Sequence, residues 1–207
     1  MEQNNIKINK EGEKREEDKK RGKIFVVSAP SGAGKTTLCA KILAKFPNLA
    51  YSVSHTTRKP RANEIDGVDY FFITVDEFKK RVEENLWAEW ATVHDNFYGT
   101  SLKFIEDNVA KGNNLLLDID VQGAKQFKRS FPEAVTIFIM PPSIDVLKER
   151  LIKRGTDSDD VIIKRLANAE SEMAQSSFYE HIIVNDQLNF SEKEMADIIS
   201  NAISKLT

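Results

Sequence analysis

The stretch of sequence that decides the fold is Ile24-Phe25-Val26-Val27-Ser28-Ala29-Pro30-Ser31-Gly32-Ala33-Gly34-Lys35-Thr36-Thr37. Its apolar start predicts a buried strand, and the helical spacing of Leu38, Ile42 and Leu43 predicts a helix after it. A strand, a glycine-containing turn and a helix in this order are typical of a loop that binds the phosphates of a nucleoside triphosphate.

Each part of this loop has a chemical role at a polyphosphate. Gly32 and Gly34 let the backbone bend with its N–H groups inward, and the next helix adds its positive N-terminal end. Lys35 is expected to reach the β- and γ-phosphates and the Thr36 hydroxyl to bind Mg²⁺. The usual pattern G-x-x-x-x-G-K-[ST] begins with glycine, where this chain has Ala29. The alternative is a glycine turn without a ligand. The residues expected to bind ATP in this loop are 29–37.

Composition limits the class of protein. With 207 residues, 41% of them hydrophobic, the chain can bury one substantial core, which favours one domain with or without insertions. A net charge of -2 offers no basic field to a nucleic-acid backbone, so no nucleic-acid partner is expected. No apolar stretch approaches the roughly 20 residues that span a bilayer, and no secretory signal is seen, so we expect a cytoplasmic protein without a membrane partner. The single cysteine, Cys39, is expected to be a buried apolar side chain.

The chain divides into a tail, a core, an inserted lobe and a lid. Residues 1–22 are charged with almost no apolar side chains, which predicts a disordered or partly helical tail before a domain that starts near Lys23. Apolar runs predict strands buried on both faces at 24–28, 115–119, 135–140 and 181–184. With helical periodicity between them, they predict an α/β fold with a P-loop NTPase core, a parallel sheet flanked by helices. Short alternating segments predict a mixed or antiparallel lobe. The expected ranges are core 23–50, 101–143 and 167–207, lobe 51–100, and helical lid about 144–166.

Two pairs of residues predict helix starts. Thr74 with Glu77 forms a capping box that opens a helix through Val82, and Ser191 with Glu194 forms another for the C-terminal helix.

The inserted lobe carries groups that suit a phosphate. The segment Ser54-His55-Thr56-Thr57-Arg58-Lys59-Pro60-Arg61 places two arginines around a proline-stiffened turn, and guanidinium forks match a phosphate dianion. Tyr70 and Tyr98 are each able to donate a phenolic hydroxyl to the same group. The alternative for the arginines is an exposed basic turn.

Other residues of the lobe suit a guanine edge. Glu89 beside Trp90 supplies an acceptor carboxylate, and Tyr98-Gly99-Thr100 supplies a hydroxyl. The alternative for Glu89 is a solvated charge at a helix end.

Taken in order and spacing, the phosphate loop, Ser54 to Arg61, Gly67-Val68-Asp69-Tyr70, Glu89-Trp90, Tyr98-Gly99-Thr100 and Leu117-Asp118-Ile119-Asp120-Val121-Gln122-Gly123 resemble the guanylate kinases. The resemblance extends from about Lys23 to the C-terminus. It implies the reaction ATP + GMP = ADP + GDP, with Mg²⁺ accompanying ATP and with a monomer or a homodimer. It implies that the GMP phosphate is held by Arg58, Arg61, Tyr70 and Tyr98. The implied surroundings of the base are Ser54, Glu89, Thr100 and Asp120, and Gly99 also belongs to the implied GMP site.

The remaining expected site residues concern the metal and the lid. Asp118 ends an apolar strand as a Walker-B carboxylate does and is expected to hold Mg²⁺ through water, the alternative being a cap on the next helix. Arg150 and Arg154 on one lid helix and Arg165 on the next are expected to close over the ATP phosphates. The alternative is exposed pairing with Asp145, Glu149 or Asp160. The resemblance implies that Asn185 lies near the adenine. The residues given a catalytic role are Lys35, Arg58, Arg150, Arg154 and Arg165.

No general base is required, because a GMP phosphate is already an anionic nucleophile, so His55, His94 and His181 receive no catalytic role. Two other functions stay open. One is a scaffold module of the same fold that binds phosphorylated peptides, which intact Lys35 and Thr36 disfavour. The other is a small P-loop kinase acting on a sugar phosphate or a different nucleotide, which Glu89 disfavours.

Overall fold

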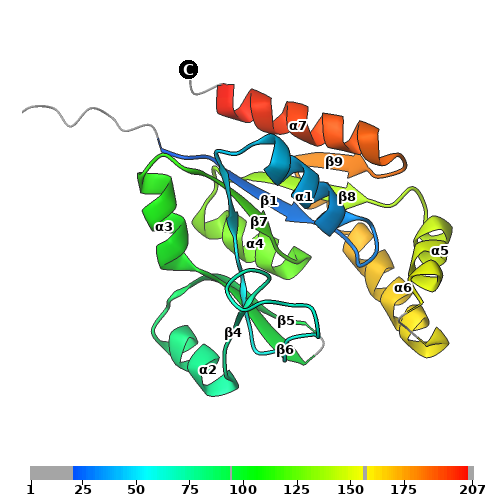
Figure 1. Cartoon of the computed structure of the whole chain (residues 1–207), viewed down its shortest axis with the longest axis horizontal. Coiled ribbons are helices and arrows are strands. Elements are labelled where there is room, and N and C mark those ends of the chain that lie inside the picture. Colours follow the sequence, from blue (N-terminus) through cyan, green and yellow to red (C-terminus); the bar gives the residue numbers. More distant parts are fainter. Residues whose placement is uncertain (1–20, 94, 156–157, 205–207) are drawn as a thin grey trace, which may run out of the picture.

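The computed structural model describes residues 21–93, 95–155 and 158–204. Figure 1 shows a helix-covered sheet, a smaller lobe that carries a second sheet, and a pair of helices beyond the end of strand β1. Most of the predicted tail, residues 1–20, lies outside the described residues.

The core is a five-stranded parallel sheet with the strand order β2-β7-β1-β8-β9. Its strands are β2 (Leu49–Ser52), β7 (Asn114–Asp118), β1 (Ile24–Ser28), β8 (Val135–Met140) and β9 (His181–Val184). β1 lies in the centre, and all five of its residues are buried, because both faces of the sheet are covered. The predicted α/β fold class is confirmed.

Alternating side chains of β1 enter two separate hydrophobic layers. Ile24 and Val26 pack with α3 (Leu102–Ala110) and α4 (Val121–Ser130), whereas Phe25 and Val27 pack with α1 (Lys35–Lys45) and α7 (Leu188–Ser204). Figure 1 shows these helix pairs on opposite sides of the sheet. Cys39 is buried in the second layer, and this burial raises the pKa of its thiol to about 12, so it is the buried apolar side chain that was predicted. None of the described helices has the length and apolar character needed to cross a bilayer.

The inserted lobe is built on a mixed four-stranded sheet with the order β4-β3-β6-β5. The elements are β3 (His55–Thr56), β4 (Phe71–Phe72), α2 (Val75–Glu83), β5 (Trp87–Val93) and β6 (Asn96–Ser101). The Thr74 hydroxyl accepts a hydrogen bond from the Glu77 amide at 3.2 Å, which confirms the predicted start of α2. The ring of Phe78 on α2 stacks on Trp87 at 4.6 Å and on Phe97 at 5.2 Å, so the lobe has an aromatic core of its own.

One core helix holds the edge of this second sheet. Gln126 of α4 donates from Nε2 to the Trp90 carbonyl at 2.8 Å and accepts from the Trp90 amide at Oε1 at 3.3 Å. Its side-chain amide therefore takes the place of a neighbouring strand along β5, satisfying backbone groups that an edge strand leaves unpaired.

The segment predicted to form a lid contains α5 (Ile144–Arg154) and α6 (Asp159–Met173). Leu147 and Leu151 of α5 pack against Ile162 and Ala169 of α6, so the two helices share a small apolar core. A short 3₁₀ helix, η1 (Ser176–Phe178), leads from α6 toward β9.

Three sequence-based boundaries differ from the structure. Tyr51 and Ser52 belong to β2 of the core sheet, where they pair with Leu116 and Leu117, so the lobe begins after Ser52. α6 continues to Met173, so the lid boundary expected at residue 166 falls inside one helix. The predicted cap at Ser191 is wrong, because α7 already begins at Leu188. The Ser191 hydroxyl instead donates to the carbonyls of Val184 and Gln187, both at 3.3 Å.

We predict that Phe127→Ala lowers the free energy of unfolding by about 3–5 kcal/mol, because it leaves a cavity in the layer under α4. Phe127 is fully buried and its ring stacks on Phe131 at 4.6 Å. The control is Phe104→Ala on α3, where the side chain is 38% exposed and the expected loss is about 1 kcal/mol or less. Urea denaturation followed by circular dichroism measures both, and equal losses in the two variants would contradict the prediction.

Candidate active site

The loop between β1 and α1 has the backbone of a phosphate-binding turn. Gly32 and Gly34 have φ values of +95° and +98°, which glycine adopts without the strain that a Cβ would cause. The Ala33 amide donates to the Pro30 carbonyl at 3.0 Å and closes the turn. Gly34 is the N-cap of α1, so the loop ends at the positive end of a helix, at the carboxyl edge of a parallel sheet.

Lys35, the first residue of α1, forms an ion pair with Asp118 at the end of β7. β1 and β7 are neighbours, with Val27 in register with Asp118, so the fold brings this carboxylate to the loop. Burial alone lowers the pKa of Lys35, but the charge and hydrogen bond of Asp118 outweigh burial and raise it above its ordinary value. Lys35 is therefore a cation at neutral pH.

Asp118 does not cap the next helix, since Asp120 does. The Asp120 side chain accepts from the Gly123 amide at 2.8 Å and opens α4. Thr36, the expected hydroxyl ligand, is exposed on the first turn of α1, next to the ion pair of Lys35 with Asp118.

The structure brings Arg58, Tyr70 and Tyr98 together in the lobe. Arg58 Nε donates to the Tyr98 hydroxyl at 3.2 Å, its guanidinium carbon lies 5.4 Å from the centre of the Tyr70 ring, and the two tyrosine rings are 5.8 Å apart. Ser54 lies at the start of the same sheet, where its carbonyl accepts from the Phe71 amide at 2.9 Å.

Glu64 is a site residue that sequence reasoning missed. Its two carboxylate oxygens accept from Arg58 Nη2 at 2.8 Å and Nη1 at 2.9 Å, and Oε2 also accepts from the Arg61 amide at 2.8 Å. The hydrogen bonds from Arg58 lower the pKa of Glu64, and they raise the pKa of Arg58. The Arg61 guanidinium, 66% exposed, lies 3.8 Å from the same carboxylate. The signal in the sequence was an acidic residue three positions after Arg61.

Glu89 and Thr100 face each other on β5 and β6 inside the protein. Thr100 Oγ1 donates to Glu89 Oε1 at 2.6 Å, and the two residues are 0% and 5% exposed, respectively. The reading of Glu89 as a solvated charge is therefore wrong. Burial raises the pKa of Glu89 to about 7, with a further contribution from the negative charge of Asp120, while the hydrogen bond from Thr100 opposes the shift.

Two glycines make room around this pair. A Cβ on Gly123 would lie 2.3 Å from Glu89 Oε2, so the first turn of α4 accommodates the carboxylate only with glycine. A Cβ on Gly99 would lie 3.0 Å from the ring of Phe78 and 3.1 Å from that of Trp87. Gly99 thus lets β6 approach the aromatic core of the lobe.

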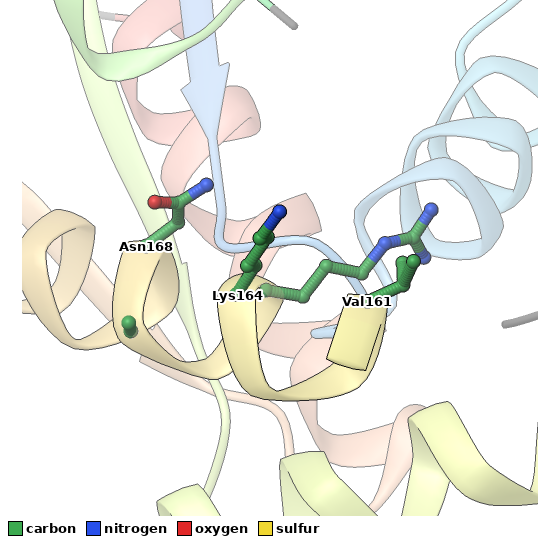
Figure 2. A pocket seen from close by; sticks show the side chains of 5 residues that line it. Val161, Lys164 and Asn168 are labelled. Carbon is green, nitrogen blue, oxygen red and sulfur yellow. The ribbon is translucent and has the colours of Figure 1, made fainter. Parts of the chain in front are cut away.

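The lid supplies polar groups near the phosphate loop. Arg165 lines a cavity of about 430 Å³ together with four other residues of α6: Val161, Lys164, Ala167 and Asn168. Figure 2 shows that Lys164 and Asn168 project from the same side of this helix. Sequence reasoning did not single out these two polar residues, although a separation of four positions places Lys164 and Asn168 on one face of a helix. Arg150 Nη2 donates to the Asn185 carbonyl at 2.9 Å. The side chain of Arg154 lies outside the described residues.

His55 packs between aromatic rings, 4.7 Å from Phe71 and 5.1 Å from Trp87. Burial lowers its pKa to about 4, so the imidazole is neutral at pH 7. His181 begins β9 in register with Ile137, and His94 lies outside the described residues.

A parallel sheet whose central strand runs through this glycine loop into a helix defines a P-loop NTPase. A sequence model described as Guanylate kinase matches residues 21–202. A guanylate kinase of Geobacter sulfurreducens is 50% identical over 181 residues, which cover 87% of this chain and 89% of the relative. One of Carboxydothermus hydrogenoformans is 44% identical over 180 residues, covering 87% and 88%. The crystal structure of guanylate kinase from Anaplasma phagocytophilum superposes with a TM-score of 0.72 at 36% identity, covering 88% of this chain and 87% of that one. The chain belongs to the guanylate kinase family.

We predict that Arg58→Ala raises the KM for GMP about tenfold or more, because charge-assisted hydrogen bonds to a phosphate contribute about 1.5–3 kcal/mol each. The KM for ATP is expected to stay within about twofold, since Arg58 lies in the lobe with Tyr70 and Tyr98. Steady-state kinetics measures both constants, and Arg58→Lys, which keeps the charge without the planar fork, should recover only part of the loss. An equal rise in both KM values would contradict the prediction.

We also predict that Glu89 makes stability depend on pH. Its folded pKa of about 7 lies above the ordinary glutamate value of 4.5, so the folded state binds more protons between these values. The contribution of Glu89 to the free energy of unfolding is therefore greatest below pH 4.5 and falls as pH rises through 7. Glu89→Gln should gain stability relative to wild type between pH 5 and 8, on the order of 3 kcal/mol.

Urea denaturation at pH 5, 6, 7 and 8 measures this difference. Glu83→Gln, at an exposed position on α2, is the matched control. The prediction fails if the difference between wild type and Glu89→Gln is the same at every pH.

Proposed function

We propose that this protein transfers the γ-phosphoryl group of ATP to GMP, giving ADP and GDP. The observation that carries the proposal is the buried carboxylate of Glu89, held by the Thr100 hydroxyl in a lobe that also gathers Arg58, Tyr70 and Tyr98. Membership of the guanylate kinase family and the names of the relatives support the same reaction.

Glu89 explains a choice of guanine over adenine. Guanine presents N1–H and the 2-amino group as adjacent donors, which one carboxylate accepts together, whereas adenine has neither donor at this edge. A buried carboxylate without these donors is costly, so analogues that lack them are rejected by roughly 10⁴ to 10⁵. Donation from guanine favours the charged form and lowers the pKa of Glu89 in the complex.

Arg58 and the two tyrosines are assigned to the GMP phosphate, with Arg61 as a second cation. The ion pair with Glu64 supports this assignment, because Arg58 Nη2 and Nη1 donate to the two carboxylate oxygens of Glu64 at 2.8 and 2.9 Å. A phosphate dianion offers the same pair of oxygens. Ser54, Gly99 and Asp120 are proposed to complete the GMP site.

ATP is assigned to the loop from Ala29 to Thr37, where the partly buried Lys35 supplies a cation to the β- and γ-phosphates. The oxygen donors of Thr36 and Asp118 suit Mg²⁺, which would neutralise charge on the phosphates. Lid arginines 150, 154 and 165 are proposed to add positive charge around the moving phosphoryl group. The transfer depends on alignment and electrostatics, so no base is assigned.

A coupled assay for ADP release, run with Mg-ATP and separately with GMP, AMP, CMP, UMP and no acceptor, tests the proposal. We expect kcat/KM to be greater for GMP by about 10⁴ or more. Turnover on AMP or on a sugar phosphate with none on GMP would exclude this function. Binding of GMP without any turnover would favour the scaffold alternative. The cytoplasmic location and the monomeric or homodimeric state stay predictions.

A further inference from the structure

Asn185, directly after β9, connects three parts of the protein. Its backbone amide donates to the Met140 carbonyl at the end of β8 at 2.7 Å, and its backbone carbonyl accepts from Arg150 Nη2 at 2.9 Å. Its side chain reaches the phosphate loop, where Nδ2 donates to the Ala33 carbonyl at 2.7 Å. Asn185 is only 6% exposed and Ala33 is fully buried, so this contact lies inside the protein.

We propose that Asn185 is a positioning residue that fixes the peptide between Ala33 and Gly34 and thereby orients a phosphate-binding N–H group. The C=O and N–H bonds of a trans peptide point in opposite directions in one plane. Because Asn185 holds the Ala33 carbonyl, the Gly34 N–H points away from Asn185. This donor directly precedes Lys35 at the N-terminus of α1, where backbone N–H groups serve an anion. The inference rests on the proposed function.

Close packing at Gly34 supports the assignment. A Cβ at this position would lie 2.3 Å from Asn185 Nδ2, nearer than side chains approach, so the amide is seated directly against the loop. Gly34 is therefore needed both for its φ of +98° and for this approach. The side chain and the loop conformation depend on each other.

Arg150 connects Asn185 and the phosphate loop to helix α5. Its guanidinium binds the carbonyl of the same residue whose side chain holds the loop. The lid helix α5 and the peptide before Lys35 are thus joined through one residue.

The side-chain amide of Asn185 separates this role from recognition of adenine. Nδ2 is engaged by Ala33, whereas a contact with the 6-amino group of adenine requires the oxygen, Oδ1. Asn185→Asp keeps an oxygen acceptor but places a second oxygen against the Ala33 carbonyl, where two acceptors repel. Asn185→Ala removes both groups.

The experiment compares wild type, Asn185→Asp and Asn185→Ala with ATP and with inosine triphosphate, which lacks the 6-amino group, at saturating GMP. If Asn185 positions the loop, both variants lower kcat/KM by about 10- to 100-fold, and by the same factor for both donors. The affinity for GMP, measured by calorimetry, should stay within about twofold. Asp186→Asn, at an exposed neighbouring position, is the control and should change kcat/KM by less than about twofold.

The proposal is overturned if Asn185→Asp keeps wild-type kcat/KM with ATP, or if Asn185→Ala loses activity with ATP alone, which would make Asn185 a reader of the base. Calorimetric titration of ATP into the same variants tests the loop independently of turnover. If wild type binds ATP but does not phosphorylate GMP, the proposed function fails. In that case a weaker ATP affinity in Asn185→Asp still supports the positioning role, and an unchanged affinity contradicts it. Circular dichroism spectra confirm that each variant is folded.

Discussion

The ion pair between Lys35 and Asp118 is the interaction on which the donor side of the site depends. A partly buried lysine at the positive end of α1 is unfavourable by itself, because desolvation and the helix dipole both oppose its charge. Asp118 offsets this cost, and it is in place because β7 pairs in parallel with β1 and ends at the same edge of the sheet. The loop between β1 and Lys35 must therefore turn within six residues, and positive φ angles at Gly32 and Gly34 allow it to do so.

The inserted lobe contains two charged side chains shielded from water, Arg58 and Glu89, and they are stabilised in different ways. Arg58 has an anionic partner, Glu64, so its charge is balanced within the protein. Glu89 is bonded to a hydroxyl, and its pKa of about 7 shows that its ionised form is only partly stabilised. A ligand with two adjacent donors supplies the missing stabilisation. The burial that destabilises the ionised form of Glu89 is therefore also the physical basis of the proposed specificity for guanine.

The sequence was sufficient to predict the elements that follow from local patterns. β1, β8 and β9 match apolar runs within a residue, and the loop glycines match their motif. Tyr51 and Ser52, the second half of β2, were assigned to the lobe, because β2 is short and partly polar and its pairing with β7 is not encoded locally. Ser191 and Glu194 matched a capping pattern, but the helix starts earlier, where the chain leaves the sheet. The contact of Asn185 with Ala33 was missed because it joins residues 152 positions apart and arises only from the tertiary fold. Glu64 was also missed, although it lies only six residues after Arg58, because it belongs to no motif that was recognised.

Helix α4 joins the inserted lobe, which has its own aromatic core, to the rest of the protein. Its N-cap is Asp120, its first turn accommodates the Glu89 carboxylate at Gly123, and its second turn binds the backbone of Trp90 through Gln126. The contacts at Gly123 and Gln126 are both made with β5, at one edge of the second sheet, whereas β4 lies at the opposite edge, beyond β3, the strand that leads to Arg58. If the lobe rotated while Gln126 stayed hydrogen-bonded to Trp90, Glu89 on β5 would move little. Arg58 and Glu64, farther from β5, would move more. The fold therefore constrains the Glu89 end of the lobe, proposed to bind the base, more strongly than the Arg58 end, proposed to bind the phosphate.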